Sequence, residues 1–368
     1  MQQPHFALLS VSAAVRFCKV IISLNVQILL KSFRKEFENS TSRGTSNSEG
    51  RCMQRYAPQV EEEKLKVFHF PLFVFRLFCY LCAHKYIYPK MKAVSTVKAL
   101  REELAQHQGK KIGFVPTMGA LHEGHISLVE RARKECDIVV SSVFVNPTQF
   151  NDKNDLRNYP RTPEADAKML EAAGVDVVLF PSVEEIYPEP DTRQFDFGQI
   201  DKVMEGATRP GHFNGVAQVV SRLFDIVEPT CAYFGEKDFQ QIAVIRAMVA
   251  QLGYNIEIID CPIIRDFDGL ARSSRNLLLT PEHRAAAPHI YEVLSAAVAK
   301  VGELSPAELT EWVVAEVEKN ELLKVIYFAA VDALSMQTIE NWSDSERVQG
   351  CIAVQAGEIR LIDNIKLK

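Results

Sequence analysis

The sequence has 368 residues, of which 47% are hydrophobic and 24% are charged. These proportions indicate a globular protein with room for two domains, and they exclude general disorder. The formal net charge of -5 argues against a nucleic-acid-binding protein, which would need a surplus of basic residues.

The charge is unevenly distributed along the chain. Residues 1–90 contain 13 basic and 6 acidic side chains, whereas residues 91–368 contain 29 and 41. Residues 39–50 (NSTSRGTSNSEG) have the composition of a linker, which cannot build a core. We therefore expect residues 1–90 to be a poorly ordered N-terminal extension, of the kind that arises when the start codon is misassigned. We expect the functional protein to begin at or near Met91.

Residues 67–82 (VFHFPLFVFRLFCYLC) form an apolar run within this extension. The run is shorter than the ~20 residues of a membrane span and contains a proline and an arginine, so we expect no membrane association. Cys79 and Cys82 form a CxxC without a second pair at ligand spacing, which argues against a zinc site. The 8 cysteines show no disulfide framework, which predicts reduced thiols and a cytoplasmic protein.

From Met91 onward, predicted helices and strands alternate. Val94, Val97, Leu100 and Leu104 have helical spacing and predict a first helix. Strands are predicted at residues 112–115, 138–145, 175–180, 231–234 and 256–264, and helices at residues 125–136, 162–174, 214–227 and 238–253. Apolar strands that alternate with helices favour an α/β fold, a doubly wound parallel sheet of the Rossmann-like kind.

After residue 264 the order of elements changes. Two helical stretches, 280–301 and 305–320, precede three predicted strands at residues 325–334, 351–357 and 359–365. Ser305 and Glu308 match a capping box at the start of the second helical stretch. We therefore predict a Rossmann-like domain over residues 91–264 and a smaller α+β domain over residues 265–368.

Residues 116–125 (PTMGALHEGH) lie between a predicted strand and a predicted helix, at the edge where doubly wound sheets bind ligands. Two glycines before a helix N-terminus are features of a phosphate-binding loop. The segment matches neither GxxxxGK[ST] nor GxGxxG, and it is not HExxH. Three interpretations stay open from these residues: phosphate contact by His122 and His125, a two-histidine zinc site, and two loop histidines without a ligand.

Six motifs along residues 91–368 together resemble one enzyme family. The segment PTMGALHEGH resembles the HxGH signature of the nucleotidylyl-transferase superfamily. The others are FVNPTQF (144–150), YPRT (159–162), RPGHFNGV (209–216), FGEKDFQQ (234–241) and DGLARSSRN (268–276). In this order and at this spacing, the motifs are similar to those of the pantothenate synthetase (pantoate–β-alanine ligase) family.

The resemblance implies a reaction in two steps. Pantoate would attack the α-phosphate of ATP to give pantoyl adenylate and pyrophosphate, and β-alanine would then displace AMP to give pantothenate. Negative charge gathers on the phosphate in the first transition state, which calls for fixed hydrogen-bond donors more than for a nucleophile. ATP would be a co-substrate accompanied by Mg²⁺, and the resemblance also implies a homodimer.

The resemblance further implies which residues contact the nucleotide. His122 and His125 would hydrogen-bond the phosphates as charge develops, and His125 matches a position described as a proton donor. Lys237 would be the third catalytic group, on phosphate, and Asp238 would bind the ribose hydroxyls. The implied ATP-binding set is Met118, Gly119, Ala120, Leu121, His122, Glu123, Gly124, His125, Gly235, Glu236, Lys237, Asp238, Ile264, Arg272, Ser273, Ser274 and Arg275.

The other substrates and the metal have fewer implied contacts. Gln149 and Gln241 would bind pantoate, because an amide can donate to a carboxylate and accept from a hydroxyl without adding charge. Gln149 would also lie toward the β-alanine site. Asp155 would be an acidic group near Mg²⁺.

Two positions depart from the family pattern. Arg272 stands where we expect Leu or Met, which leaves open whether its side chain points to phosphate or to solvent. Gln218 stands where Thr is common, and we expect it on a helix face away from the ligands. For Arg209 and His212, within RPGHFNGV, we favour a structural role that shapes the wall of the pocket.

Two other functions compete with the ligase. A nucleotidyltransferase of the same superfamily would adenylylate a phosphate acceptor, and it would not need the two glutamines or FVNPTQF. A non-catalytic nucleotide-binding regulator would not need to retain His125, Lys237 and the SSR triplet, all of which are present.

Overall fold

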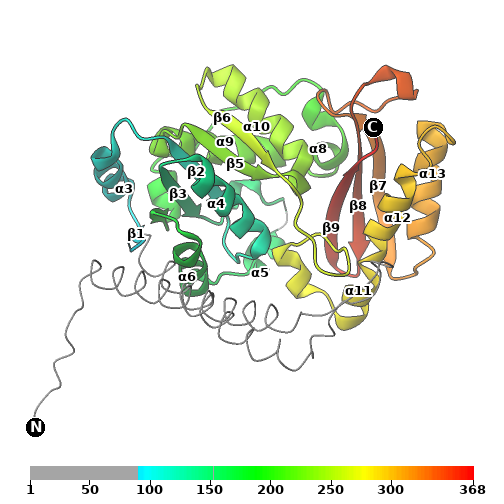
Figure 1. The fold of residues 1–368 in the computed structure, drawn as a ribbon, viewed down its shortest axis with the longest axis horizontal. Helices are drawn as coiled ribbons and strands as arrows, with labels where there is room; N and C mark the ends of the chain where they lie inside the picture. Colours follow the sequence, from blue (N-terminus) through cyan, green and yellow to red (C-terminus); the bar gives the residue numbers. More distant parts are fainter. Residues whose placement is uncertain (1–89, 152) are drawn as a thin grey trace, which may run out of the picture. The chain divides into compact units, whose positions relative to one another are not determined.

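The structure, a computed structural model, describes residues 90–151 and 153–368, which fall into one compact unit (Figure 1). Three predictions lie outside the described residues: the poorly ordered extension, the apolar run at residues 67–82, and the CxxC of Cys79 and Cys82. The domain boundary between residues 264 and 265 stays a prediction, although the two regions have separate sheets.

A parallel sheet of six strands, in the order β1-β4-β3-β2-β5-β6, forms the centre of the first region. Its strands are β1 (Lys92–Val94), β2 (Ile112–Thr117), β3 (Ile138–Val143), β4 (Val177–Leu179), β5 (Cys231–Gly235) and β6 (Glu257–Cys261). Because β3 and β5 lie on opposite sides of β2, the direction of strand addition reverses there. Open α/β sheets bind ligands at such a switch point, beyond the carboxyl ends of the strands. The doubly wound parallel fold is confirmed.

Helices cover both faces of this sheet (Figure 1). On one face Phe114 of β2 joins a core with three longer helices and Ile186 of the short helix Val183–Ile186, and on the other Val115 joins a core with two helices. Both side chains are fully buried, because neighbouring residues of a strand point to opposite faces. The three helices are α3 (Val97–Leu104), α9 (His212–Val227) and α10 (Phe239–Leu252), and the two are α4 (Glu123–Glu135) and α6 (Pro163–Ala173).

The second region has an antiparallel sheet in the order β7-β8-β9, with helices packed on it (Figure 1). Leu294, Val313 and Ile352 belong to the core that joins these helices to the sheet. Ser305 and Glu308 form the predicted capping box. The strands are β7 (Leu323–Asp332), β8 (Val348–Ala356) and β9 (Ile359–Lys366), and the helices are α11 (Pro281–Ala286), α12 (His289–Val298) and α13 (Pro306–Val317).

Short helices connect these elements and supply much of the functional site. They are α5 (Lys153–Asn158), α7 (Val183–Ile186) and α8 (Met204–Thr208), with the 3-10 turns η1 (Ala105–His107), η2 (Pro147–Gln149), η3 (Ile200–Lys202), η4 (Glu236–Asp238), η5 (Ser274–Leu278) and η6 (Trp342–Asp344). Of these, η2, η4, η5 and α5 follow strands or loops at the carboxyl edge of the parallel sheet and carry predicted site residues.

The first predicted helix is shorter than its apolar spacing suggested. Val94 ends β1, where it pairs with Leu179 of β4. Helix α3 begins only at Val97, because the side chain of Thr96 accepts a hydrogen bond from the N–H of Ala99 and caps the helix there. The apolar residues with helical spacing therefore belong to a strand and a helix. Both elements contribute buried residues to the same core.

Boundaries also differ at the PTMGALHEGH segment. The predicted strand 112–115 continues through Pro116 and Thr117, which still pair with Ser142 and Val143 of β3. Helix α4 begins at Glu123 and not near His125. The loop between strand and helix is therefore only residues 118–122.

Prolines explain the remaining large differences. The predicted strand 256–264 ends at Cys261, directly before Pro262. The helical stretch 280–301 is divided into α11 and α12 near Pro288, which cannot donate a helical hydrogen bond. The other predicted elements agree with the structure to within about three residues at each end.

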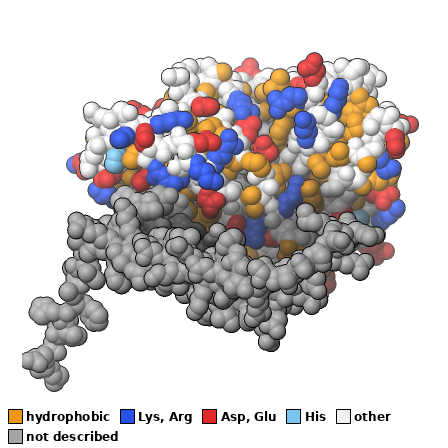
Figure 2. Space-filling view, in the orientation of Figure 1, with side chains coloured by type: hydrophobic (Ala, Val, Ile, Leu, Met, Phe, Trp, Pro, Cys, Tyr) orange, Lys and Arg blue, Asp and Glu red, His pale blue; other side chains and the backbone are white. Residues whose placement is uncertain are grey.

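The surface carries charges of both signs. On the face shown in Figure 2, Lys and Arg side chains are interspersed with Asp and Glu, and hydrophobic atoms lie between them. Within residues 90–151 and 153–368, no helix is both long and apolar enough to cross a membrane.

Candidate active site

The loop that follows β2, residues 118–122, is held by Asp166 of α6; we call it the glycine loop. Its backbone takes positive φ angles at Gly119 (84°) and Ala120 (48°). The two carboxylate oxygens of Asp166 accept hydrogen bonds from the N–H groups of Ala120 (3.1 Å) and Leu121 (2.9 Å). A Cβ at position 119 would lie 3.0 Å from the carboxylate, so glycine satisfies both the angle and the space.

His122 and His125 cap the N-terminus of α4 reciprocally. Nδ1 of His122 accepts from the N–H of Gly124 (3.1 Å), and Nδ1 of His125 accepts from the N–H of His122 (3.3 Å). A neutral imidazole has one acceptor and one donor nitrogen, so the proton of each ring lies on Nε2. With ring centroids 4.2 Å apart, the two rings place two Nε2–H donors side by side at a helix N-terminus.

Gly124 is required by the position of the first histidine ring. A Cβ at residue 124 would lie 2.7 Å from Cε1 and 2.8 Å from Nδ1 of His122. Any side chain would therefore push the His122 ring out of its capping position. This contact gives a physical reason for the spacing His-x-Gly-His.

Both imidazoles are neutral near pH 7. Burial lowers the pKa of His122 to about 4, and the positive charges of Lys237 and Arg272 contribute to the shift. Burial also lowers the pKa of His125 to about 3, with His122 as the next cause. Among the described residues, no cluster of three His, Cys, Asp or Glu side chains could complete a zinc site, which needs three or four ligands. The arrangement therefore suits donation of hydrogen bonds from neutral rings.

Lys237 and Asp238 follow β5, on the other side of the switch point. Lys237 Nζ lies 3.2 Å from Asp238 Oδ1. Burial opposes ionisation of Asp238, yet the charge of Lys237 and their hydrogen bond hold the pKa of Asp238 below its usual value. The carboxyl ends of β2 and β5 thus bring a cation and an anion beside the two neutral histidines.

Gln149 and Gln241 reach the same space from different elements. Oε1 of Gln149, in η2, accepts from Asn146 Nδ2 (3.3 Å), and its Nε2 lies 2.9 Å from Met118 Sδ. Asn146 is 1% exposed, and its amide also donates to the carbonyl of Gly215 in α9 (3.2 Å). Gln241 extends from the first turn of α10 and is half-buried. The amide of Gln149 is therefore oriented by the protein before any substrate is bound.

Residues 273–275 approach the site from the segment that leads into the second region. Ser273 caps η5 by accepting from the N–H of Arg275 (3.3 Å). Ser274 is buried, with its Oγ 3.4 Å from the hydroxyl of Tyr159. Arg275 donates to Asp155 Oδ2 (2.8 Å), and its guanidinium lies 5.8 Å from the centre of the Tyr159 ring. The SSR triplet is thus packed against the YPRT motif of the first region.

The side chain of Arg272 points to the start of α4. Its guanidinium forms ion pairs with Glu123 and with Asp266, the latter at 2.9 Å. Its main-chain N–H donates to the carbonyl of Ile264 (2.9 Å). The Arg272 side chain, which departs from the family pattern, therefore pairs with carboxylates of the protein itself.

Gln218 and His212 both make structural contacts on α9. Gln218 is buried, and its amide donates to the carbonyls of Asp191 (3.0 Å) and Arg193 (2.9 Å). His212 Nδ1 lies 2.8 Å from the carbonyl oxygen of Gln149. Gln218 therefore fastens a surface segment to α9, and His212 supports the turn that carries Gln149.

Most of the predicted site residues surround one cavity of about 220 Å³. It lies beyond the carboxyl ends of β2 and β5, as expected for a ligand site in a doubly wound sheet. The predicted residues that line it are Met118, His122, Gly124, His125, Gln149, Gly235, Lys237, Asp238, Gln241, Ile264, Arg272, Ser273, Ser274 and Arg275.

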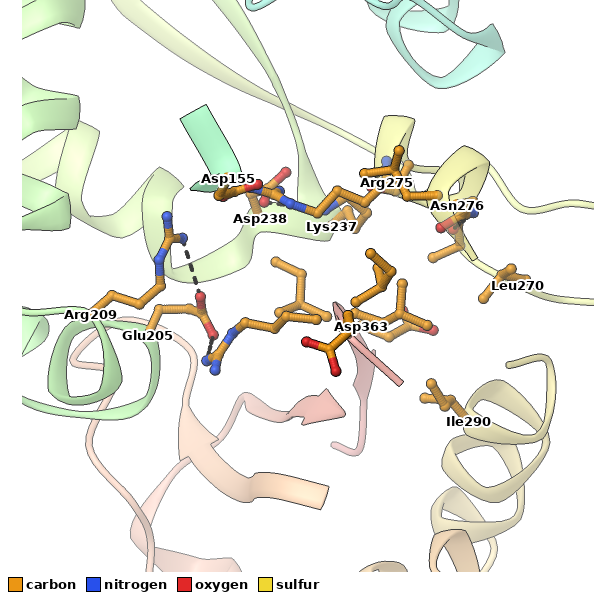
Figure 3. Close-up of a pocket in the computed structure, with 18 of the residues that line it drawn as sticks. Asp155, Glu205, Arg209, Lys237, Asp238, Leu270, Arg275, Asn276, Ile290 and Asp363 are labelled. Carbon is orange, nitrogen blue, oxygen red and sulfur yellow. Dashed lines mark hydrogen bonds and ion pairs between the residues drawn. The ribbon is translucent and has the colours of Figure 1, made fainter. Parts of the chain in front are cut away.

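A second cavity of about 620 Å³ shares part of this lining. Figure 3 shows Asp155 beside the shared residues, with Asp363 of β9 across the cavity and the ion pair of Arg209 and Glu205 at one end. Both regions of the molecule therefore contribute charged groups to it. The residues that line both cavities are Lys237, Asp238, Ser273 and Arg275.

Some predicted residues line neither of these two cavities. Three of them belong to the glycine loop, Glu123 pairs with Arg272, and Glu236 lies in η4. Asp155 lines only the larger cavity, where its carboxylate pairs with Arg275. The residues outside both linings are Gly119, Ala120, Leu121, Glu123 and Glu236.

Three residues that build this site were not predicted from the sequence. Asn146 and Tyr159 both line the smaller cavity, and each lies inside a quoted motif that could have drawn attention to it. Asp166 lies in α6 outside every motif and has the sequence context of an exposed acid. Its burial, at 1% exposure, follows only from the packing of α6 against the glycine loop.

The comparisons with known proteins identify a family. Residues 92–366 match the family model described as pantoate-beta-alanine ligase. A pantothenate synthetase of Porphyromonas gingivalis (strain W83) is 58% identical over 278 residues, which cover 75% of this chain and 99% of that protein.

Solved structures show the same similarity. Pantothenate synthetase from Thermus thermophilus has a TM-score of 0.71 and 45% identity, over 75% of this chain and 99% of that one. A pantoate-beta-alanine ligase from Francisella tularensis, complexed with beta-gamma ATP and beta-alanine, has a TM-score of 0.63 and 36% identity, over 75% and 98%. The chain therefore belongs to the pantoate-beta-alanine ligase family.

Proposed function

We propose that the cavity beside His122 and His125 is where this chain, as a pantoate–β-alanine ligase, condenses pantoate with β-alanine using ATP. The observation that carries the proposal is the pair of histidines whose Nδ1 atoms are occupied in helix capping, so that two Nε2–H donors remain. Lys237 and the amides of Gln149 and Gln241 line the same cavity, and they suit a phosphate and a hydroxy acid respectively.

In the first step, a carboxylate oxygen of pantoate attacks the α-phosphorus of ATP. A new C–O–P linkage forms, the bond from the α-phosphorus to the bridging oxygen breaks, and pyrophosphate leaves with the electron pair. The Nε2–H groups of His122 and His125 donate to the α-phosphate oxygens as they gain charge, and Lys237 neutralises the phosphates. Because these donors are in place beforehand, little reorganisation is needed in the transition state.

The segment with the SSR triplet holds the departing phosphates. Ser273 and Ser274 supply hydroxyl donors, and Arg275 supplies a planar guanidinium that suits phosphate oxygens. Arg275 is already at the edge of both cavities, where it pairs with Asp155. Exchange of that carboxylate for phosphate would bring the guanidinium onto the pyrophosphate.

In the second step, the amine of β-alanine attacks the carbonyl carbon of pantoyl adenylate. The C–N bond forms, the bond from carbon to the AMP oxygen breaks, and the amine loses a proton as AMP departs. Gln149 and Gln241 hold the pantoyl group, and Gln149 also lies toward the β-alanine. Asn146 holds Oε1 of Gln149, and one Nε2–H of Gln149 lies against Met118 Sδ, so the other Nε2–H would donate to the substrate.

Mg²⁺ would accompany ATP at this site. This ion is usually held by one or two carboxylates together with substrate phosphates and waters. Asp155 and Asp238 line the larger cavity with Lys237 and Arg275, so the carboxylates that such binding requires are present. When bound, Mg²⁺ would neutralise charge on the phosphates, and Asp155 is the residue proposed to hold it.

We also propose that the protein is a cytoplasmic homodimer, as the resemblance to the family implies. Light scattering on the purified full chain would test the assembly. A homodimer should have about twice the 41.5 kDa mass of one chain. A mass equal to one chain at micromolar concentration would contradict it.

The function is tested by separating the two steps with the purified full chain. Pyrophosphate release from ATP should depend on pantoate, and formation of AMP and pantothenate should depend on β-alanine. Turnover of ATP without pantoate would instead indicate a different nucleotidyltransferase, and nucleotide binding without turnover would indicate a regulator. Neither alternative is favoured, because the matching family and relatives are ligases.

A further inference from the structure

The last strand of the second sheet reaches across to the loop that carries Lys237. Asn364 of β9 is only 3% exposed, and its Nδ2 donates two hydrogen bonds. The acceptors are the main-chain carbonyls of Glu236 (2.8 Å) and Lys237 (3.0 Å), in η4 of the first region. One side chain of the second region thus holds two consecutive peptide groups of a nucleotide-binding segment.

The orientation of the Asn364 amide is itself fixed. Gln349, on the neighbouring strand β8, donates from Nε2 to Asn364 Oδ1 at 2.7 Å. This bond identifies the oxygen of Asn364 and leaves its NH₂ group facing the two carbonyls. Hydrogen bonds therefore connect Gln349 of β8 to Asn364, and Asn364 to η4.

The preceding residue, Asp363, holds the root of the SSR segment. Its two oxygens accept from Arg265 Nη1 (2.6 Å) and Nη2 (2.9 Å), and Asp363 is 6% exposed. The guanidinium of Arg265 also lies 3.7 Å from the centre of the Tyr291 ring and donates to the carbonyl of Gly269 (3.2 Å). Arg265 is therefore fixed from three directions.

Arg265 in turn sets the path of the residues that lead to the SSR triplet. It forms an isolated antiparallel bridge with Ala271, and the N–H of Arg272 donates to Ile264. Residues 264 and 265 are thus tied to residues 271 and 272, directly before Ser273. Moving Arg265 would move the start of the triplet with it.

We propose that Asp363 and Asn364 are positioning residues for the nucleotide. Asn364 fixes the main chain that carries Lys237 and Asp238, and Asp363 fixes Arg265 at the root of the segment that carries Ser273, Ser274 and Arg275. Two adjacent residues of one strand thereby set the relative position of both phosphate-binding segments. This inference rests on the proposed function, because those segments matter only if ATP binds between them.

The chemistry of the pair supports this role over a purely structural one. A buried amide and a buried carboxylate are costly unless they are hydrogen-bonded, and an apolar pair would suit a sheet core equally well. The partners of Asn364 Nδ2 and of the Asp363 carboxylate lie mainly on the two phosphate-binding segments rather than within the second sheet. Figure 3 shows Asp363 on the wall of the larger cavity, across from Lys237, Asp238 and Arg275.

The first experiment replaces the donor amide with an acceptor of the same shape, Asn364→Asp. Two carbonyl oxygens would then face a carboxylate oxygen, and η4 should move away. We expect the KM for ATP to rise about tenfold and kcat for pantoate-dependent pyrophosphate release to fall as well, because Lys237 moves with η4. Hydrogen exchange of the nucleotide-free full chain should become faster in peptides that cover residues 235–239.

The matched control is Trp342→Phe. It also removes a side-chain hydrogen bond to a main-chain carbonyl in the second region, from Trp342 Nε1 to Leu304 (2.8 Å). A merely structural role predicts the same result for both variants, namely a lower melting temperature with an unchanged KM for ATP. If Asn364→Asp matched this control in the KM for ATP and in exchange at residues 235–239, the proposal would be overturned.

Two milder variants keep the test decisive if Asn364→Asp does not fold. Gln349→Leu removes the bond that orients the Asn364 amide and should raise the KM for ATP about threefold. Asp363→Asn weakens the hold on Arg265 and should accelerate exchange at residues 270–276. Hydrogen exchange needs no catalysis, so a chain without ligase activity would refute the proposed function while the exchange data still supported or overturned the positioning role.

Discussion

The glycine loop and the segment of residues 266–275 contact the same cavity but are held by different kinds of interaction. The loop is held by Asp166, which is 1% exposed and accepts two main-chain hydrogen bonds. Beyond its root at Arg265, the segment contacts the first region through ion pairs of partly exposed side chains, between Arg275 and Asp155 and between Arg272 and Glu123. Buried hydrogen bonds without alternatives fix a geometry, whereas partly exposed ion pairs are weak and exchangeable.

Because of this difference, we expect the two segments to have different roles at the site. The glycine loop presents the histidine donors in one fixed arrangement, as a transition state requires. In the proposed function, the Arg275 cation would exchange its carboxylate partner, Asp155, for phosphate when ATP binds. We therefore expect substitutions on the loop side to lower kcat or stability strongly, and substitutions of surface ion pairs in the segment to have small effects.

The largest effect is expected for His125→Ala. Loss of one fixed donor to the α-phosphate should lower kcat for adenylation by roughly 10²–10³. Pantoate-dependent pyrophosphate release under saturating ATP measures this rate. His107→Ala, in η1 outside both cavities, is the control and should keep the normal rate. An unchanged rate of pyrophosphate release in His125→Ala would show that His125 does not stabilise the α-phosphate in the transition state.

Asp166→Ala tests whether the glycine loop depends on its buried carboxylate. Two buried N–H groups would lose their partner, which should lower the free energy of unfolding by about 2–4 kcal/mol. The displaced loop should also reduce kcat/KM about tenfold or more. Denaturant unfolding and the pyrophosphate assay measure the two effects.

Asp176→Ala is the control for this variant. Asp176 also accepts a main-chain hydrogen bond, from Val139 (2.7 Å), and pairs with Arg133, but it lies at the amino edge of the sheet. The Asp176→Ala variant should have a lower free energy of unfolding and an unchanged kcat/KM. Equal loss of kcat/KM in both variants would show that the effect comes from general destabilisation and not from the loop.

A pH effect on stability follows from the buried neutral histidines. Burial lowers the pKa of His125 to about 3 and that of His212 to about 4, against about 6.5 in an unfolded chain. Between pH about 6.5 and about 4 the unfolded state binds more protons, so stability is present above this window and falls as the pH is lowered through it. Each such proton contributes a slope of about 1.4 kcal/mol per pH unit.

The pH effect is measured by urea unfolding at several pH values from 7.5 to 4.5. His212→Gln should flatten the dependence by about one proton relative to the unsubstituted chain. A slope that His212→Gln does not alter would mean that His212 titrates normally in the folded protein.

The smallest effect is expected for Arg272→Met, which restores the residue type common in the family. Its ion-pair partners Glu123 and Asp266 have side chains that are 63% and 21% exposed, so the pairs should contribute only about 0–1 kcal/mol. The KM for ATP should change less than about threefold. A change of tenfold or more would show that the guanidinium contacts phosphate, and Glu123→Gln would then lower the KM.

Particular elements show why some predictions succeeded. The strand, loop and helix around PTMGALHEGH follow from local patterns, because an apolar run, glycines and a helix start are properties of neighbouring residues. The capping box of Ser305 and Glu308 is likewise local and is confirmed. Val94 was assigned wrongly because its strand exists only through pairing with β4, a contact that no local pattern records.

The doubly wound fold and the chemical types of the proposed site residues could be predicted from the sequence, because periodicity and motif spacing are properties of neighbouring residues. The groups that hold these residues in place became visible only in the folded chain. The hydrogen bonds that hold them join residues 45 to 128 positions apart in the sequence. They run from Asp166 to the glycine loop, from Asn364 to η4 and from Asp363 to Arg265. Such contacts arise from packing of distant elements, and the residue types alone do not distinguish them from exposed polar side chains.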